Sequence, residues 1–295
     1  MNTRMKALLA AAGAAAVVAP IGALASAQAS TTTAPLSAVA EASTDVGGIH
    51  DEDPGFDAGV AQVTRELAAD PSARAAAERA VGVDIKVYYK VFYDRQTGKG
   101  KLTYEQALNQ TKWLNHSYSG GQGGVATRFD FVLGGYKNIA VDSRRVNLDN
   151  TTAGNGATYV SERTKSLMRN HHDGGAATLN VYVADLVGDG VDGPQGNGLI
   201  GKSTFPQYAK AHPNVDGVWY DRGAIRGTAG DGTSRNSTGD VLVHEVGHWI
   251  GALAHTDTSG ACRANFMSYA SDACMTSFTS GQADRMSSAW TRYRD

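Results

Sequence analysis

Two histidines and a glutamate near the C-terminal end of the chain have the spacing of a metal site. The segment Val241–His255 reads VLVHEVGHWIGALAH, and His244, Glu245 and His248 form an H-E-x-x-H motif within it. Residues four apart on a helix lie on one face, one turn apart, so both imidazoles can reach the same ion. Imidazole is a good ligand for Zn²⁺, and the intervening glutamate is offset enough to reach a water on the metal. The motif therefore predicts a zinc site with Glu245 as a general base.

The elements around the motif favour a helix. Asp240 is a plausible N-cap for a helix that starts at Val241. Apolar residues recur at helical spacing on the side away from the two histidines, so we expect one face of the helix to pack and the other to face a cleft. These apolar residues are Leu242, Val246, Trp249, Ile250 and Leu253.

The residues after the motif indicate how a third ligand is supplied. Gly251 allows the backbone to leave the helix sharply, through a left-handed conformation that few residues with a Cβ atom adopt. No glutamate follows Glu245, which excludes a later glutamate ligand, and His255 is the only histidine after Gly251. The remaining arrangement is the metzincin one, which needs a methionine turn below the metal, and the NFMSY segment around Met267 has that form.

Several blocks of the chain resemble one enzyme family. HEVGHWIG and the following NFMSYASDACMTSFTSGQADRM are similar to the pappalysin family of secreted zinc metalloproteases, in its branch of small bacterial and fungal enzymes. The upstream blocks GGAATLNVYVADL, STFPQY and NVDGVWYDRGAI resemble the sheet and loops of that family in the same order. Together these blocks cover most of Val83–Asp295, so the resemblance extends well beyond one short motif.

The resemblance implies a role for each candidate residue and a fold for the domain. It implies that His244 and His248 bind zinc, that Glu245 is the base, that Met267 is the methionine of the turn, and that Tyr269 stabilises the reaction intermediate. The implied fold is an α/β, metzincin-like zincin of two subdomains. We expect a twisted, mostly parallel sheet with helices, the zinc helix at the cleft, and a small C-terminal subdomain after the helix that carries the methionine turn.

The third ligand departs from the family pattern. HExxHxxGxxH would place a histidine at position 254, where this chain has Ala254, and His255 follows one residue late. The segment before the methionine turn is short, which is also similar to snapalysin, a protease whose third ligand is an aspartate. Asp257 is therefore the alternative ligand. We prefer His255 because zinc favours imidazole.

Two cysteines, Cys262 and Cys274, lie on either side of Met267. In an exported chain an even pair predicts a disulfide. Closing so short a loop would stabilise the fold by roughly 3 kcal/mol in the chain-entropy model.

The first 29 residues have the composition of a secretory signal. Arg4 and Lys6 supply positive charge, Ala7–Ala19 is apolar, and Ala25–Ala27 forms an A-x-A cleavage site. We therefore predict a signal peptide over 1–29 and a secreted, extracellular protein.

A change in composition separates residues 30–82 from the domain that follows. This segment is alanine-rich, and helical periodicity occurs only around Ala58–Ala69 and Ser72–Val81. We predict a pro-segment over 30–82 and a catalytic domain over 83–295. The segment has no cysteine, so a thiolate cannot bind the zinc and keep the precursor inactive. An acidic residue or the histidine between positions 50 and 57 could be that ligand. The alternative is that this stretch is a solvated acidic linker.

Alternating and capping patterns predict the elements of residues 83–186. They predict strands over 83–93, 128–133, 138–141 and 178–186 and helices over 103–115 and 161–170. The order of these elements is typical of an α/β sandwich.

The net charge and two weaker motifs bear on whether the protein binds nucleic acid, nucleotides or Ca²⁺. The net charge of −2 gives no reason to expect nucleic acid. Gly196–Ser203 fits a phosphate-loop pattern without the strand and helix that such a loop requires. Asp185, Asp189 and Asp192 could offer oxygen ligands to Ca²⁺, although a solvated loop is the alternative.

These features together predict a secreted, zinc-dependent endopeptidase. Its partners would be protein or peptide substrates, with no nucleic acid and no stable membrane association, and we expect a monomer. The alternative is an exported binding module on an inactive protease scaffold, because the third ligand is displaced.

Overall fold

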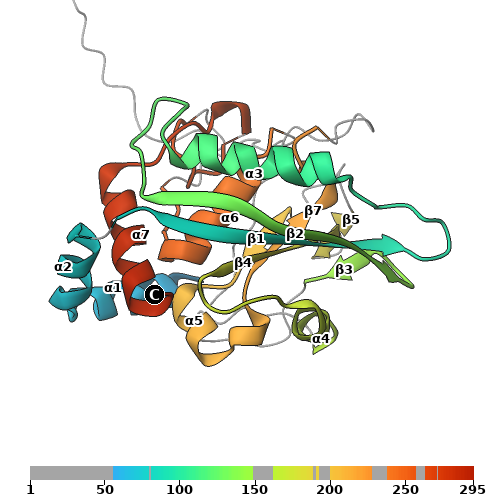
Figure 1. Cartoon of the computed structure of the whole chain (residues 1–295), viewed down its shortest axis with the longest axis horizontal. Helices are drawn as coiled ribbons and strands as arrows, with labels where there is room; N and C mark the ends of the chain where they lie inside the picture. The colour runs from blue at the N-terminus through green and yellow to red at the C-terminus, as the bar shows by residue number, and fades with distance from the viewer. Residues whose placement is uncertain are drawn as a thin grey trace, which may run out of the picture. The chain divides into compact units, whose positions relative to one another are not determined.

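A mostly parallel β-sheet forms the centre of the fold (Figure 1). The computed structural model describes residues 56–79, 81–148, 162–188, 191–192, 200–227, 238–256, 263–270 and 272–295, all in the compact unit Ala42–Asp295. Predictions for the signal peptide and for residues 30–55 lie outside the described residues. The strands are β1 (Val83–Asp94), β2 (Phe129–Val141), β3 (Arg145–Asn147), β4 (Thr178–Gly188), β5 (Val191–Asp192), β6 (Gly201–Ser203) and β7 (Val218–Asp221).

The strand order confirms the expected sheet type. Along the main path the order is β2-β1-β4-β7-β6, and neighbours pair in parallel except β6, which pairs antiparallel with β7. Strand β3 pairs in parallel with β4, and β5 pairs antiparallel with β4. Of the described strands, β6 is therefore the one that ends the sheet on the side of the metal-site helix.

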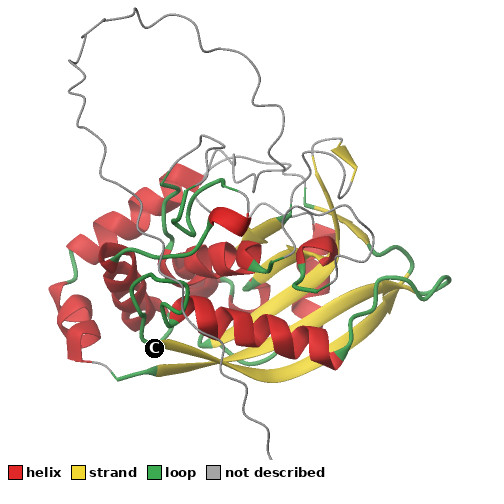
Figure 2. Ribbon diagram, turned by 90° about the horizontal axis from the view of Figure 1, so that it is seen from above, coloured by secondary structure: helices red, strands yellow, loops and turns green. Residues whose placement is uncertain are grey.

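Helices cover both faces of the sheet (Figure 1, Figure 2). They are α1 (Phe56–Ala68), α2 (Pro71–Arg79), α3 (Tyr104–Tyr118), α4 (Glu162–His171), α5 (Pro206–Ala211), α6 (Asp240–Gly251) and α7 (Ser280–Tyr293), with 3-10 turns η2 (Pro213–Val215), η3 (Arg222–Ala224) and η5 (Asp272–Cys274). Apolar side chains of α3 and α6 join one core with the sheet, and Met168 of α4 joins a second core that includes Trp219 of β7. The sheet therefore supports α6 from one side.

Local sequence signals account for most of these elements. The side chains of β1 alternate between buried and exposed along its first half, as its VDIKVYYKVFY pattern predicts. Thr103 and Gln106 form the expected capping box at the start of α3, each side chain bonded to the other's backbone N–H. The two helices predicted in the pro-segment are present as α1 and α2.

One strand prediction is wrong. The separate strands expected over 128–133 and 138–141 are a single strand, β2. Gly134 and Gly135 lie inside this strand and do not end it. An added Cβ at either position would lie within 2.9 Å of the Tyr88 ring on the neighbouring strand. These glycines make room for an aromatic ring, and the pairing register shifts between Val87 and Tyr88 at this point.

The phosphate-loop pattern is not a nucleotide site. Its described residues include Gly201–Ser203, which form β6, and the next helix begins only at Pro206. A phosphate loop would instead open a helix at that point.

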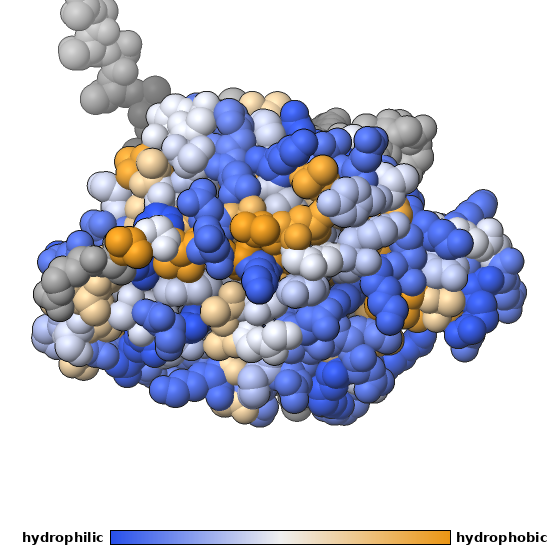
Figure 3. All heavy atoms as spheres, viewed as in Figure 1, coloured by the Kyte–Doolittle hydropathy of each residue, from blue (hydrophilic) through white to orange (hydrophobic). Residues whose placement is uncertain are grey.

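The helices and one face of the surface bear on whether the chain spans a membrane. No helix in the described ranges is both long and apolar enough to cross a bilayer. The face in Figure 3 is mostly hydrophilic, with apolar residues gathered in a band below α3.

Candidate active site

Helix α6 carries the H-E-x-x-H motif at the centre of the fold. The predicted packing of one face is present, and the histidine face is buried as well, since every residue from Asp240 to Gly251 is buried. The sheet and α7 cover its apolar side, and the backbone carbonyls of Leu253 and Phe266 contact the histidine side. The helix is therefore a core element that also carries the reactive groups.

The three predicted histidines meet at one point. The Nε2 atoms of His244 and His248 are 2.8 Å apart, those of His248 and His255 are 3.1 Å apart, and those of His244 and His255 are 3.3 Å apart. Among the described residues, these histidines form the group of side chains that could hold a metal ion. Asp257, the alternative ligand, lies outside the described residues.

The other ring nitrogen of each histidine is held by a neighbour. Nδ1 of His244 donates to the carbonyl of Phe266, and Nδ1 of His248 donates to the carbonyl of Leu253, both at 2.7 Å. Nδ1 of His255 lies 2.9 Å from the hydroxyl of Tyr269. A proton on Nδ1 leaves Nε2 as the lone-pair nitrogen, so these contacts orient all three rings for metal binding.

The donor set fits zinc. Three nitrogen lone pairs that face one another repel, and a shared cation converts that repulsion into coordination. Tetrahedral Zn²⁺ with Zn–N bonds of about 2.0–2.1 Å requires ligand nitrogens roughly 3.3 Å apart, close to the observed separations. Three protein ligands also leave one position open, which is the pattern of catalytic rather than structural zinc.

The late position of His255 is explained by the end of α6. The prediction that the chain turns through a left-handed conformation at Gly251 is wrong by one residue. Helix α6 includes Gly251, and Ala252 adopts the left-handed conformation with φ 45°. Turn and histidine are both displaced by one residue, so the imidazole still returns to the metal site.

Gly251 has a different reason to be glycine. A Cβ atom there would lie 2.9 Å from Cγ of Met286 and 3.3 Å from its Cα, on α7. The missing side chain thus lets α6 and α7 pack closely. Gly251 therefore has a structural role in helix packing, whereas the sequence predicted that it would allow a turn of the backbone.

Met267 lies directly against the metal-site helix. Its side chain is buried, and its Sδ atom is 2.8 Å from where a Cβ of Gly247 would be. Asn265 holds the turn by accepting from the Met267 N–H at 2.8 Å, and the Met267 carbonyl accepts from the Thr256 N–H at 2.9 Å. Sequence reasoning missed Gly247, although its place between the two histidines is a visible signal.

Glu245 is buried beside the end strand of the sheet. An added Cβ at Gly201 would lie 2.7 Å from both Cγ and Oε1 of Glu245. The backbone of β6 therefore forms one wall of the carboxylate site. Nothing in the local sequence indicated this contact, because Gly201 and Glu245 come from different elements.

Two arginines fix the C-terminal end of α6. Arg294 donates to the Trp249 carbonyl at 2.8 Å and lies over the Trp249 ring at 3.6 Å. Arg285 donates to the carbonyls of Gly251 at 2.9 Å and Ala252 at 3.0 Å. Cationic donors satisfy carbonyls that a helix end leaves open and favour its negative dipole end.

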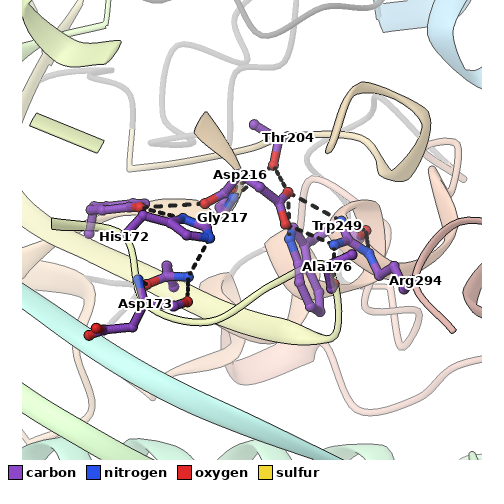
Figure 4. Close-up of polar contacts among 10 residues, drawn as sticks. His172, Asp173, Ala176, Thr204, Asp216, Gly217, Trp249 and Arg294 are labelled. Carbon is purple, nitrogen blue, oxygen red and sulfur yellow. Dashed lines mark hydrogen bonds and ion pairs between the residues drawn. The ribbon is translucent and has the colours of Figure 1, made fainter. Parts of the chain in front are cut away.

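A buried ion pair holds Arg294 itself in place (Figure 4). Arg294 and Asp216 are almost fully buried and 2.8 Å apart, and Asp216 also accepts from the Trp249 indole at 2.9 Å. Thr204 donates to the same carboxylate. This network joins the last turn of the chain to the metal-site helix, and sequence reasoning missed it entirely.

The N-terminal end of α6 differs from the prediction. Asp240 is the first helical residue, and Gly239 is the N-cap with φ 102° and no side-chain cap. The Asp240 carboxylate accepts from the Trp113 indole at 2.7 Å and from Thr238. Burial raises the pKa of Asp240, and burial together with the Asp240 charge raises the pKa of Asp272 to about 7.

Two further sequence predictions concern a Ca²⁺ site and a disulfide. Asp185, one of the candidate Ca²⁺ ligands, pairs with Arg144 at 2.8 Å and with Arg222 at 3.1 Å. Asp189 lies outside the described residues. Cys274 carries no free thiol, but Cys262 lies outside the described residues, so their pairing stays a prediction.

Known relatives fit this geometry. No protein-family model matches the chain. An extracellular metalloprotease of Trichophyton verrucosum is 25% identical over 256 residues, which cover 75% of this chain and 82% of that protein. An extracellular metalloprotease of Verticillium alfalfae is 30% identical over 156 residues, covering 41% of this chain and 52% of that protein.

The chain is a metalloendopeptidase. Its relatives are extracellular, and so is this metalloprotease. A solved structure of a Tannerella forsythia promirolysin variant matches the fold with a TM-score of 0.54 and 18% identity, covering 79% of this chain and 88% of that one. The α/β fold of the metalloprotease is thus shared with promirolysin.

The assignment of the third ligand can be tested by metal content. His255→Ala is expected to lower zinc affinity by at least about 10–100-fold, because a coordinating nitrogen is lost. Asp257→Ala is the matched control and should keep one zinc per chain. Metal analysis of dialysed protein measures both, and a zinc-free aspartate variant beside a zinc-loaded histidine variant would show the ligand assignment to be wrong.

The wall that Gly201 provides predicts a second variant. Gly201→Ala is expected to displace Glu245 and lower kcat by roughly 100-fold, the size expected for a shift of about 1 Å in a reacting group. Zinc content should stay unchanged, because the atoms nearest to the added Cβ all belong to Glu245. Gly281→Ala, where an added Cβ meets nothing within 4 Å, is the control. Equal rates for the two variants would contradict the contact.

Proposed function

We propose that the protein is a secreted zinc endopeptidase in which His244, His248 and His255 hold the metal and Glu245 is the general base. The convergence of three Nε2 atoms beside a buried glutamate carries this proposal. Zinc bound there would lower the pKa of a water molecule towards about 7 and polarise the scissile carbonyl. Side chains of the protein would carry out the proton transfers and help to stabilise the negative charge that develops on the substrate.

Glu245 would move the proton. Its carboxylate would take a proton from the attacking water and return it to the leaving amine, so no covalent intermediate with the protein is needed. The buried surroundings exclude solvent, which strengthens the interaction of this carboxylate with a nearby cation. Tyr269 would have two roles: it orients His255 through Nδ1, and its phenol would stabilise negative charge on the substrate oxygen.

Metal dependence tests the proposal directly. The secreted protein is expected to hydrolyse casein and quenched peptides, to stop after treatment with a zinc chelator, and to recover when zinc is added back. Stable cleavage at full rate after zinc removal, confirmed by metal analysis, would refute a zinc mechanism.

We extend the proposal to family and processing. The turn at Met267 would be the methionine turn of a pappalysin-like enzyme, and residues after Gly251 would form the smaller subdomain. The signal peptide 1–29, the Cys262–Cys274 disulfide and a Ca²⁺ site remain proposals of the same kind. Intact-mass measurement with and without reduction tests the disulfide.

Residues 30–82 would be a pro-segment, and α1 supports this. Helix α1 packs on α7, and its first residue, Phe56, touches two of the three ligand histidines. A helix in this position would obstruct a peptide that approaches the metal. N-terminal sequencing of the active secreted enzyme tests this, and an active form that retains α1 would contradict it.

Glu66 of α1 and Asp70, which follows α1, predict that low pH weakens the packing of α1 on α7. Glu66 accepts from the Tyr293 hydroxyl at 2.7 Å, and Arg292 pairs with both Glu66 and Asp70. Hydrogen bonds from Tyr293, Gln62 and Arg292 lower the pKa of Glu66, and those from Ser72, the Ala73 backbone and Arg292 lower that of Asp70.

The sign of the pH effect follows from these lowered pKa values. A carboxylate whose pKa is lower in the docked state stabilises docking above its ordinary pKa and loses that effect as the pH falls through the lowered value. Docking should therefore be intact at pH 7 and weaken below pH 4.5, the ordinary value for glutamate. Limited proteolysis of α1 measures this, and Glu66→Gln with Asp70→Asn should expose α1 at pH 7. Equal protection at pH 7 and pH 3.5 would refute it.

A further inference from the structure

The ring of Phe56 occupies an aromatic slot at the metal site. It lies parallel to the His255 ring, with centroids 4.5 Å apart and an angle of 10° between planes. It meets the His248 ring edge-on at 5.1 Å and the Phe205 ring at 5.2 Å and 66°. Three aromatic rings thus form the walls of the slot, and two of them are predicted zinc ligands.

Contacts outside α1 help to hold the walls of the slot. Phe205, which precedes α5, packs in one apolar cluster with Ala252 and with Ala289 and Tyr293 of α7, and Val63 of α1 belongs to the same cluster. Arg285 of α7 holds the Ala252 carbonyl at 3.0 Å, and the two histidine rings are fixed by their Nδ1 contacts. Departure of α1 would therefore open a space lined by aromatic rings, of which the two histidine rings keep their Nδ1 contacts.

The slot adjoins the position of the proposed metal. Two of its three walls are rings whose Nε2 atoms converge at that position. Residues on the two sides of a scissile bond have Cα atoms about 3.8 Å apart, so a side chain next to a carbonyl that reacts at the metal would be close enough to enter the slot.

We propose that the slot is the substrate subsite for a side chain next to the scissile bond, and that it selects large aromatic side chains. This rests on the proposed peptidase function. Phe56 would occupy in the precursor the position that a phenylalanine or tyrosine of a substrate takes in the active enzyme. Aromatic rings favour stacked and edge-on contacts such as those made by Phe56, which aliphatic side chains cannot reproduce.

The preference should be measurable with matched peptides. Quenched peptides that differ only on one side of the cleaved bond would carry Phe, Leu, Ala or Lys, and a second series would vary the other side. We expect kcat/KM of the secreted active enzyme for Phe to exceed that for Ala by about 10-fold or more in one series. No aromatic preference in either series would overturn the proposal.

Phe205→Leu locates the preference in the slot. This variant keeps an apolar side chain of similar size but removes one aromatic wall, so the ratio of kcat/KM for the Phe and Leu peptides should fall at least threefold. Phe92→Leu, in the core on the other face of the sheet, is the control for loss of a buried ring and should keep the ratio. An unchanged ratio in a folded, zinc-loaded Phe205→Leu protein would overturn the assignment.

Binding without turnover gives a second readout. Calorimetry on the Glu245→Gln variant should show tighter binding of the Phe peptide than of the Ala peptide, since no cleavage is needed. The experiments distinguish a failure of the proposed peptidase function from a failure of the proposed subsite. No metal-dependent cleavage of any peptide would refute the peptidase proposal, whereas cleavage without aromatic selection would refute only the subsite.

Discussion

Glu245→Gln is expected to lower kcat by about 10²–10⁴-fold while one zinc per chain remains bound. The amide keeps the size and the hydrogen-bonding capacity of the side chain but cannot take a proton from water. Glu245 lies on α6 between the two motif histidines and is fully buried, so solvent has little access to replace it as a base. Steady-state kinetics and metal analysis of the same preparation measure both quantities.

Glu105→Gln is the matched control for this substitution. Glu105 lies in the exposed first turn of α3, far along the chain from the metal site, and its loss should leave kcat unchanged. Loss of zinc from Glu245→Gln would instead make the glutamate a ligand, and retention of the wild-type rate would remove it from the reaction.

Arg294→Met is expected to lower the free energy of unfolding by about 3–5 kcal/mol. The variant would leave the Asp216 carboxylate buried without its 2.8 Å cation, and it would remove the donor to the Trp249 carbonyl at the end of α6. An unpaired buried charge costs far more than the ion pair contributes on its own. Denaturant unfolding of the precursor measures the change.

Arg292→Met is the matched control, only two residues away on the same segment. Its guanidinium is partly exposed, and its partners Glu66 and Asp70 are also accessible to solvent. Exposed pairs typically contribute about 1 kcal/mol or less, so this variant should lose far less stability than Arg294→Met. Similar losses for the two arginines would show that burial of Asp216 is not the cause.

The sequence alone was sufficient where neighbours along the chain carry the information. His244, Glu245 and His248 were predictable because a single helical turn sets their relative positions. The capping box of Thr103 and Gln106 and the alternation of β1 are local in the same way. The α/β class also followed from the order of such local elements, whereas the mostly parallel sheet was implied by the family resemblance.

Only the tertiary structure decided how His255 reaches the site. Its return depends on Ala252 taking the left-handed conformation in place of Gly251, whose missing side chain is needed for contact with Met286 on α7. Similarly, Gly134 and Gly135 stay inside β2 because a ring from β1 fills their space. In each case the residue type is visible in the sequence, but its cause is a neighbour distant along the chain.

The contacts that complete the site were also beyond local patterns. Gly201 borders Glu245, Arg294 and Asp216 anchor α6, and Phe56 lies on His255 from a position far earlier in the chain. Periodicity and capping are properties of consecutive residues, so they reveal which side chains can act together on one element. Which surfaces of separate elements meet depends on packing of the entire core, and that packing brought His255 to the other two histidines, Gly201 to Glu245 and Phe56 to His255.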